Sequence, residues 1–121
     1  MAYTKFGELM RILRIKNREV MGDTAKLLNV KLPFISAVEN GKRNVPEEWF
    51  EILVNHYNLT KSEQEELNEA IELSRTQVKV NLINSSSFKR EMAVQFQRSF
   101  DSIDDDTAEK IIKLLNNSKE V

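Results

Sequence analysis

The sequence predicts an all-α protein, in which five N-terminal helices are followed by a short extended segment and a C-terminal helical hairpin. Two observations support this fold class. Apolar residues recur at three- and four-residue spacing through most of the chain, which is typical of amphipathic helices. Only three glycines and two prolines interrupt the 121 residues, so helices should dominate. We expect two parts, residues 1–74 and residues 75–121.

The first three helices are expected over residues 4–16, 21–28 and from about 32 to 40. Pro33 is acceptable in the first turn of the third helix, because the missing N–H has no partner within a helix there. Asn40 and Gly41 are a typical C-terminal cap, so this helix should end at them. The second and third helices are therefore short and joined by a tight turn.

Two further helices complete the N-terminal part. Pro46 is expected to open the fourth helix, again as a first-turn proline. Thr60 and Glu63 have the spacing of a capping box, in which each side chain accepts a hydrogen bond from the backbone of the other residue. The fifth helix should begin there and run to about Ser74.

The segment from Gln77 to Ile83 alternates apolar and polar residues, which is the pattern of a half-buried strand. A lone strand leaves its backbone groups without partners, so pairing with the same segment of a second chain is the simplest arrangement. A plain extended linker is the alternative reading of this segment.

Two helices are expected after the serine run 85–87, and Asp104 to Asp106 should cap the second of them. Such short helices bury too little surface to be stable alone, so they must dock on the N-terminal part or on a partner chain. A homodimer is the leading expectation and an intramolecular cap is the alternative. The expected dimerisation residues are Val78, Val80, Leu82, Phe88, Met92, Phe96 and Phe100, the last four of which repeat every four residues.

Composition limits the location and the chemistry. The chain has no cysteine, so it can form neither a disulfide framework nor a thiolate metal site, which suits a reducing compartment. No signal-peptide pattern precedes Phe6, and no apolar run approaches eighteen residues. We therefore expect a cytoplasmic protein without a membrane partner.

Charge is distributed unevenly along the chain, although the net charge is only −1. Residues 1–62 contain ten Lys and Arg against seven Asp and Glu, a balance of +3. Residues 63–121 contain eight against twelve, a balance of −4. Basic surfaces are the usual footprint of phosphate binding, so nucleic-acid contact is expected in the first half.

Residues 21–43 resemble the helix-turn-helix of the Cro/CI, or XRE, family of repressors. The features that match in type and spacing are Ala25, Val30, Ile35, Val38 and the ending Glu39-Asn40-Gly41-Lys42-Arg43. The resemblance covers about half of the chain and implies a lambda-repressor-like fold for the N-terminal domain. It also implies a regulator, commonly a homodimeric repressor of a phage, plasmid or other mobile element, that binds double-stranded DNA with its third helix in the major groove.

The resemblance implies specific roles for individual residues. Arg14 and Glu39 are expected to form a structural ion pair. Lys42 and Arg43 are expected to contact DNA phosphates, and the alternative is that they belong to an ordinary solvated loop. Phe34 is expected either at a thymine methyl group or in the core. The expected DNA-binding residues are Lys31, Leu32, Phe34, Ser36, Asn40, Lys42 and Arg43, with Ala37 beside them.

An enzyme is not expected, because the single histidine, His56, has neither a cysteine nor a second histidine to complete a catalytic or metal site. Neither a cofactor nor a metal is predicted. The alternative function is a protein-interaction module with the helix-turn-helix fold and little or no specific DNA binding, which uses Leu32, Phe34 and the acidic C-terminal half to bind another protein. Steep salt dependence would favour DNA over a protein partner.

Overall fold

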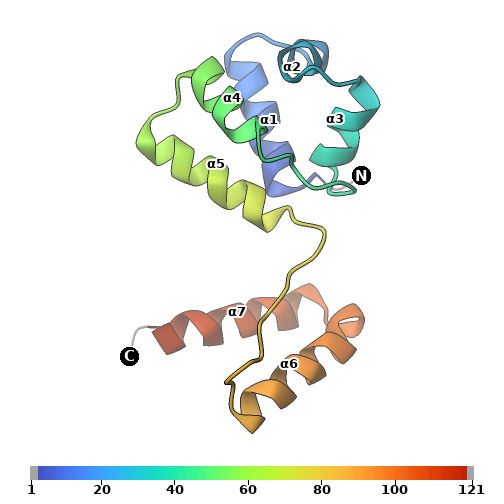
Figure 1. The fold of residues 1–121 in the computed structure, drawn as a ribbon, viewed down its shortest axis with the longest axis vertical. Helices are drawn as coiled ribbons and strands as arrows, with labels where there is room; N and C mark the ends of the chain where they lie inside the picture. Colours follow the sequence, from blue (N-terminus) through green and yellow to red (C-terminus); the bar gives the residue numbers. More distant parts are fainter. Residues whose placement is uncertain (1–2, 120–121) are drawn as a thin grey trace. The chain divides into compact units, whose positions relative to one another are not determined.

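The computed structural model describes residues 3–119, and this range is helical and contains no strand (Figure 1). The chain divides into two compact units, Met1–Val78 and Lys79–Val121. No helix in the described range is long and apolar enough to cross a membrane. The elements are α1 (Lys5–Lys16), α2 (Met21–Leu28), α3 (Leu32–Glu39), α4 (Trp49–Tyr57), α5 (Lys61–Leu73), α6 (Ser87–Ser99), the 3-10 helix η1 (Phe100–Ser102) and α7 (Asp105–Lys119).

Side-chain caps fix the starts of α1 and α5. The Thr4 hydroxyl accepts a hydrogen bond from the Gly7 N–H and begins α1. The capping box predicted for α5 is confirmed, because the Thr60 N–H donates to Glu63 and the Glu63 N–H donates to the Thr60 hydroxyl. These caps satisfy N–H groups that have no partner within the helix.

The predicted start of α4 at Pro46 is wrong. Pro46 instead begins a turn, in which its carbonyl accepts a hydrogen bond from the Trp49 N–H at 3.1 Å, and α4 begins at Trp49. The Trp49 side chain is buried against Phe6 and Phe34, with ring centroids 6.3 and 5.9 Å apart. Tertiary packing of this indole, rather than the proline signal, positions the helix.

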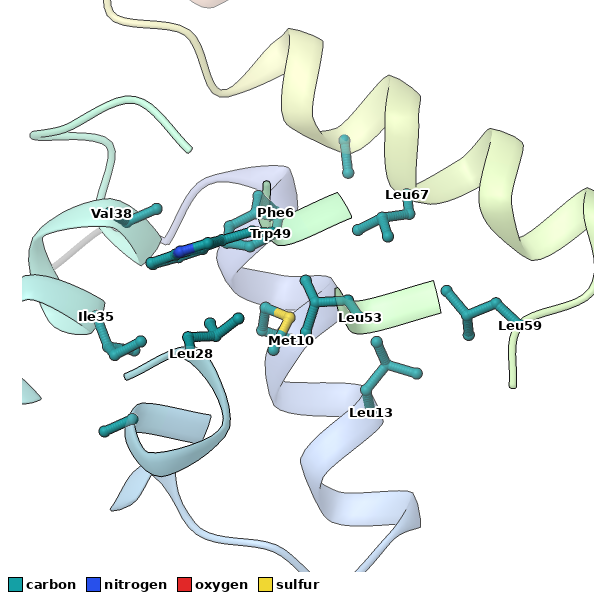
Figure 2. Close-up of a cluster of buried hydrophobic side chains, with 12 residues drawn as sticks. Phe6, Met10, Leu13, Leu28, Ile35, Val38, Trp49, Leu53, Leu59 and Leu67 are labelled. Carbon is teal, nitrogen blue, oxygen red and sulfur yellow. The ribbon is translucent and has the colours of Figure 1, made fainter. Parts of the chain in front are cut away.

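The hydrophobic core of the first unit is built around α1, which contacts both α3 and α5 (Figures 1 and 2). Figure 2 shows the side chain of Met10 of α1 next to that of Leu53 of α4, and the ring of Phe6 overlaps the Trp49 indole in this view. Full burial of each large apolar side chain contributes about 1.5–3 kcal/mol. The buried apolar residues are Phe6, Met10, Leu13, Ala25, Leu28, Ile35, Val38, Trp49, Leu53, Leu59, Leu67 and Ala70.

The first unit extends slightly beyond the expected boundary at residue 74. The reason is a tether: the backbone N–H and the hydroxyl of Thr76 both donate to the Asn44 side-chain oxygen, at 2.9 and 3.1 Å. Asn44 lies in the loop before α4. These contacts hold the chain against the first unit for a few residues after α5 ends.

The strand predicted for residues 77–83 is absent from the described residues. Val78, Val80 and Ile83 are exposed and only Leu82 is half-buried, so the apolar side chains of this segment have no common surface to cover. Strand pairing needs a neighbouring strand, and residues 3–119 of one chain supply none. Within a single chain, the linker reading describes this segment.

In the second unit, α6, η1 and α7 follow one another as expected for a helical pair. Ser86 caps α6 by accepting from the Lys89 N–H, and Asp104 caps α7 by accepting from the Thr107 N–H. The stripe from Phe88 to Phe100 is not covered within the single chain, because α6 has no buried residue. Two helices of this size lack the surface to cover it.

Candidate nucleic-acid interface

The turn between α2 and α3 is set by one residue with positive φ. Asn29 ends α2 in the left-handed conformation (φ 56°, ψ 49°), which asparagine tolerates better than most residues. The next residue, Val30, donates its N–H to the Ala25 carbonyl at 3.0 Å and packs against the core. Lys31 then serves as the N-cap residue of α3, so only three residues separate the two helices.

α3 has distinct inner and outer faces. Ile35, Val38 and Glu39 are buried beneath it. On the other side, Leu32 and Pro33 are exposed, and Ser36 shares this face at helical spacing. Ala37 and Asn40 are half-buried at its edge, and the Asn40 side-chain N–H group donates to the Ser36 hydroxyl at 3.3 Å. The outer face therefore consists mostly of short or uncharged side chains.

The end of α3 fixes the direction of the following loop. Gly41 adopts φ 79°, while its N–H donates to the Val38 carbonyl and the Lys42 N–H donates to the Ala37 carbonyl. This pair of bonds is a Schellman motif, for which glycine is the preferred residue. The cap predicted at Asn40 and Gly41 is confirmed. Lys42 and Arg43 leave the helix in a defined direction, and both are exposed.

Arg14 and Glu39 form a buried, bidentate ion pair. The two guanidinium nitrogens of Arg14 lie 2.7 and 2.8 Å from the two carboxylate oxygens of Glu39, and Arg14 also donates to the Thr24 hydroxyl at 3.4 Å. The hydrogen bond to Glu39 raises the pKa of Arg14 above its ordinary value, against a lowering by burial. The pair joins α1 to the end of α3.

Burial of Glu39 has an electrostatic consequence for the surface. It is the only acidic residue between Lys26 and Arg43, its side chain is 1% exposed, and Arg14 compensates its charge. All exposed charges in this stretch are positive, and they belong to Lys26, Lys31, Lys42 and Arg43. Cations therefore flank the outer face of α3 at both ends.

Lys26 belongs to this group but was not among the residues predicted from sequence. It lies in the last turn of α2 and lines a shallow hollow of about 290 Å³ together with Asn29 and Lys31. The signal was weak, because a lysine in the last turn of a helix is common for its interaction with the helix dipole alone.

Phe34 is half-buried and packs edge-on against Trp49. Phe34 packs against the hydrophobic core, as the core reading from sequence expects. Its other contact is with Arg43, whose guanidinium carbon lies 5.1 Å from the ring centroid. A guanidinium stacked on an aromatic face has restricted freedom, so Phe34 holds Arg43 in place.

A second polar cluster, remote in sequence, was not predicted. Glu19 accepts a hydrogen bond from the Tyr57 hydroxyl at 2.6 Å, and its other oxygen lies 2.7 Å from Nε2 of His56. Burial raises the pKa of Glu19, but the bonds from Tyr57 and His56 outweigh it and leave the pKa below its ordinary value. Among the described residues no group of three potential ligands is arranged to hold a metal ion. The cluster ties the loop before α2 to α4.

The residues expected at a dimer interface lie apart from the helix-turn-helix in sequence. Val78 is the last residue of the first unit, and the other six belong to the second unit. Five of these six are exposed and Leu82 is half-buried.

No family model matches the chain. No curated protein and no solved structure is significantly similar to it either.

Proposed function

We propose that this chain is a sequence-specific DNA-binding regulator with a lambda-repressor-like N-terminal domain, which acts as a homodimeric repressor in the cytoplasm. In this proposal α3 enters the major groove and α2 lies across the DNA backbone. One observation carries it: the stretch from Lys26 to Arg43, which contains α3 and the turn before it, has four exposed cations, and its single carboxylate, on Glu39, is buried and paired.

The cations fit phosphate contact at both edges of a groove. Lys26 and Lys31 flank the turn before α3, and Lys42 and Arg43 follow its end. Contacts of this kind position a protein on DNA without reading its sequence. An exposed carboxylate between these cations would repel the phosphates, so the ion pair with Arg14 supports binding indirectly.

Base reading falls to the outer face of α3. The Ser36 hydroxyl, the Asn40 side-chain NH2 group and the Lys31 ammonium group supply hydrogen-bonding groups, and Leu32, 49% exposed, is suited to contact a thymine methyl group. The short side chains of Ser36 and Ala37 allow the helix backbone to approach the base edges closely. Few polar groups are available, so discrimination between sequences should be modest.

Fluorescence anisotropy tests the proposal, with the duplex immediately upstream of the gene for this protein and a scrambled duplex of equal length. The wild type should bind the upstream duplex more tightly, and Lys42→Ala/Arg43→Ala should weaken binding. The matched control is Lys16→Ala/Lys61→Ala, which removes two exposed cations near the start of α5. Equal effects of the two double substitutions would contradict the proposed site.

A protein-interaction role is the second candidate, favoured by a shallow hollow of about 310 Å³ between α1 and α5. Its apolar lining comes from Leu9, Ile12, Ala70 and Leu73, of which Ile12 and Leu73 are exposed. Apolar contact depends little on salt, whereas phosphate contact weakens steeply as salt rises. Equal, weak binding to both duplexes would favour this candidate.

A further inference from the structure

The segment that follows α5 carries positive charge and no negative charge. Residues 73–90 include four lysines and arginines but neither an aspartate nor a glutamate. The first two of these cations, Arg75 and Lys79, lie where the chain forms neither helix nor strand (Figure 1). Both side chains are exposed, and neither forms an ion pair within the described residues 3–119. Their charge is therefore available to an anionic partner.

Two anchors hold the start of this segment against the first unit. The buried Ser74 hydroxyl accepts a hydrogen bond from the Phe6 N–H at 3.1 Å. Two residues later, the N–H and the hydroxyl of Thr76 donate to the Asn44 side-chain oxygen at 2.9 and 3.1 Å. Arg75 lies between these anchors, so its backbone is held in place while its side chain is exposed.

The anchors place Arg75 beside the end of α3. Asn44, which holds the second anchor, is the residue directly after Lys42 and Arg43. The start of α1, which holds the first anchor, is itself joined to the end of α3 through hydrogen bonds to the Glu39 carbonyl. Cations from two separate segments of the chain therefore lie in one region of the first unit.

We propose that residues 75–79 are a second DNA-contacting element, in which Arg75 and Lys79 bind phosphates next to those bound by the loop after α3. This inference rests on the DNA-binding function proposed above and extends its contact surface to the segment after α5. Lys79 is the first residue after the first unit, and three residues of fully extended chain from Thr76 reach at most about 11 Å. The segment can therefore follow the DNA backbone while its start stays fixed.

The chemistry of the segment matches phosphate. The planar guanidinium of Arg75 can donate two hydrogen bonds to one phosphate, and the Lys79 ammonium group pairs with phosphate as a point charge. The adjacent loop is already proposed to bind the DNA backbone, and this continuity favours DNA over an acidic protein as the partner. Because the tether to Asn44 fixes the start of the segment in advance, less conformational freedom is lost on binding.

Fluorescence anisotropy of the full-length chain at several salt concentrations tests this element, with the upstream and the scrambled duplex. Arg75→Ala/Lys79→Ala should weaken binding on the order of tenfold at low salt. It should also reduce the slope of log affinity against log salt by about two, because two phosphate contacts are lost. The fold-change should be the same for both duplexes, since phosphate contacts carry no sequence information.

The control for net charge is Lys16→Ala/Lys61→Ala. It removes the same charge from the last turn of α1 and the first turn of α5, which are the ends of these helices remote from the two anchors. Its effect on affinity should be much smaller. Both double substitutions replace exposed side chains, so Trp49 fluorescence during urea unfolding should show the first unit equally stable in each.

A double-mutant cycle tests the tether. Asn44→Ala removes the acceptor of both Thr76 hydrogen bonds, so it should weaken DNA binding several-fold in the wild-type chain. In the Arg75→Ala/Lys79→Ala background it should have little effect, because the tether acts through these two cations. Equal effects of Asn44→Ala in both backgrounds would show that the tether does not serve this segment.

The outcomes separate this element from the proposed function. Suppose that Lys42→Ala/Arg43→Ala weakens binding while Arg75→Ala/Lys79→Ala has no more effect than the control. The second element is then refuted, and the DNA-binding function stands. A loss of affinity confined to one duplex would also contradict phosphate contact by this segment. A wild-type chain that shows no salt-sensitive DNA binding would overturn both proposals.

Discussion

Gly7 of α1 lies directly against the backbone carbonyl of Glu39 at the end of α3. A Cβ atom at position 7 would overlap the Glu39 carbonyl oxygen, and backbone atoms cannot move aside as a flexible side chain can. The same carbonyl accepts hydrogen bonds from the Thr4 N–H and hydroxyl, at 3.1 and 3.0 Å. This contact sets the distance between the core helix and the helix proposed to read DNA.

Gly7→Ala should therefore destabilise the first unit by about 2 kcal/mol or more, because overpacking displaces α3 from α1. Gly22→Ala is the matched control, since a Cβ there meets no atom within 4 Å and α2 gains a better helix former. Urea unfolding followed by Trp49 fluorescence measures both. Equal stabilities of the two variants would contradict the close packing of α1 and α3.

Removal of Arg14 should be one of the most damaging single changes in the chain. Arg14→Met leaves the Glu39 carboxylate buried without compensation, which costs about 3–5 kcal/mol. Arg14→Met/Glu39→Leu removes both charges and should be less destabilising than the single change. Lys5→Met, which breaks an exposed pair with Glu8 at 3.9 Å, should change the free energy of unfolding by less than about 0.5 kcal/mol. An effect of Arg14→Met as small as this control would disprove the buried pair.

The Glu19 cluster predicts a pH dependence. The pKa of Glu19 in the folded chain lies below its ordinary value, so the ionised carboxylate stabilises the fold. This contribution is complete at pH values above the pKa of Glu19 in the unfolded chain, near 4.5. It is lost as the pH falls through the lower pKa that Glu19 has in the folded chain. The difference in unfolding free energy between wild type and Glu19→Gln should therefore shrink as the pH falls below about 4.5. A difference that grew on acidification would reverse the assigned sign.

The stacking of Arg43 on Phe34 predicts that the charge of this side chain and its fixed position contribute separately to DNA affinity. Arg43→Lys keeps the charge but loses the planar contact, so DNA affinity should fall several-fold while the salt dependence stays the same. Arg43→Ala should reduce the slope of log affinity against log salt by about one. Anisotropy titrations at several salt concentrations give both quantities. An unchanged slope for Arg43→Ala would show that Arg43 does not contact a phosphate.

Helix ends that are determined locally could be predicted from the sequence. The Thr60 box and the Gly41 cap depend on residues three or four positions apart, which can be read directly from the sequence. The start of α4 could not be predicted from Pro46, since it depends on how Trp49 packs against Phe6, 43 positions away in the chain. The prediction of a strand from Gln77 to Ile83 was wrong for a related reason, because an alternating pattern does not reveal whether a partner strand exists.

The candidate site also has features that the sequence predicts and features that it does not. The exposure of Lys42 and Arg43 can be predicted, because they follow a glycine cap at the end of a helix. The orientation of the Phe34 side chain cannot be predicted, because it depends on contact with Trp49 of α4. The contacts of Glu19 with His56 and Tyr57 span 37 and 38 positions, and no local pattern predicts them.

A titration of the ¹⁵N-labelled chain with the upstream duplex, followed by amide chemical shifts, tests whether α3 and its flanking cations bind DNA. The largest shifts should occur at Lys31, Ser36, Lys42 and Arg43, with small shifts at Leu9 and Leu73 in the hollow between α1 and α5. Shifts concentrated in that hollow, or none at saturating duplex, would contradict the assignment of α3 and its flanking cations as the DNA-binding surface.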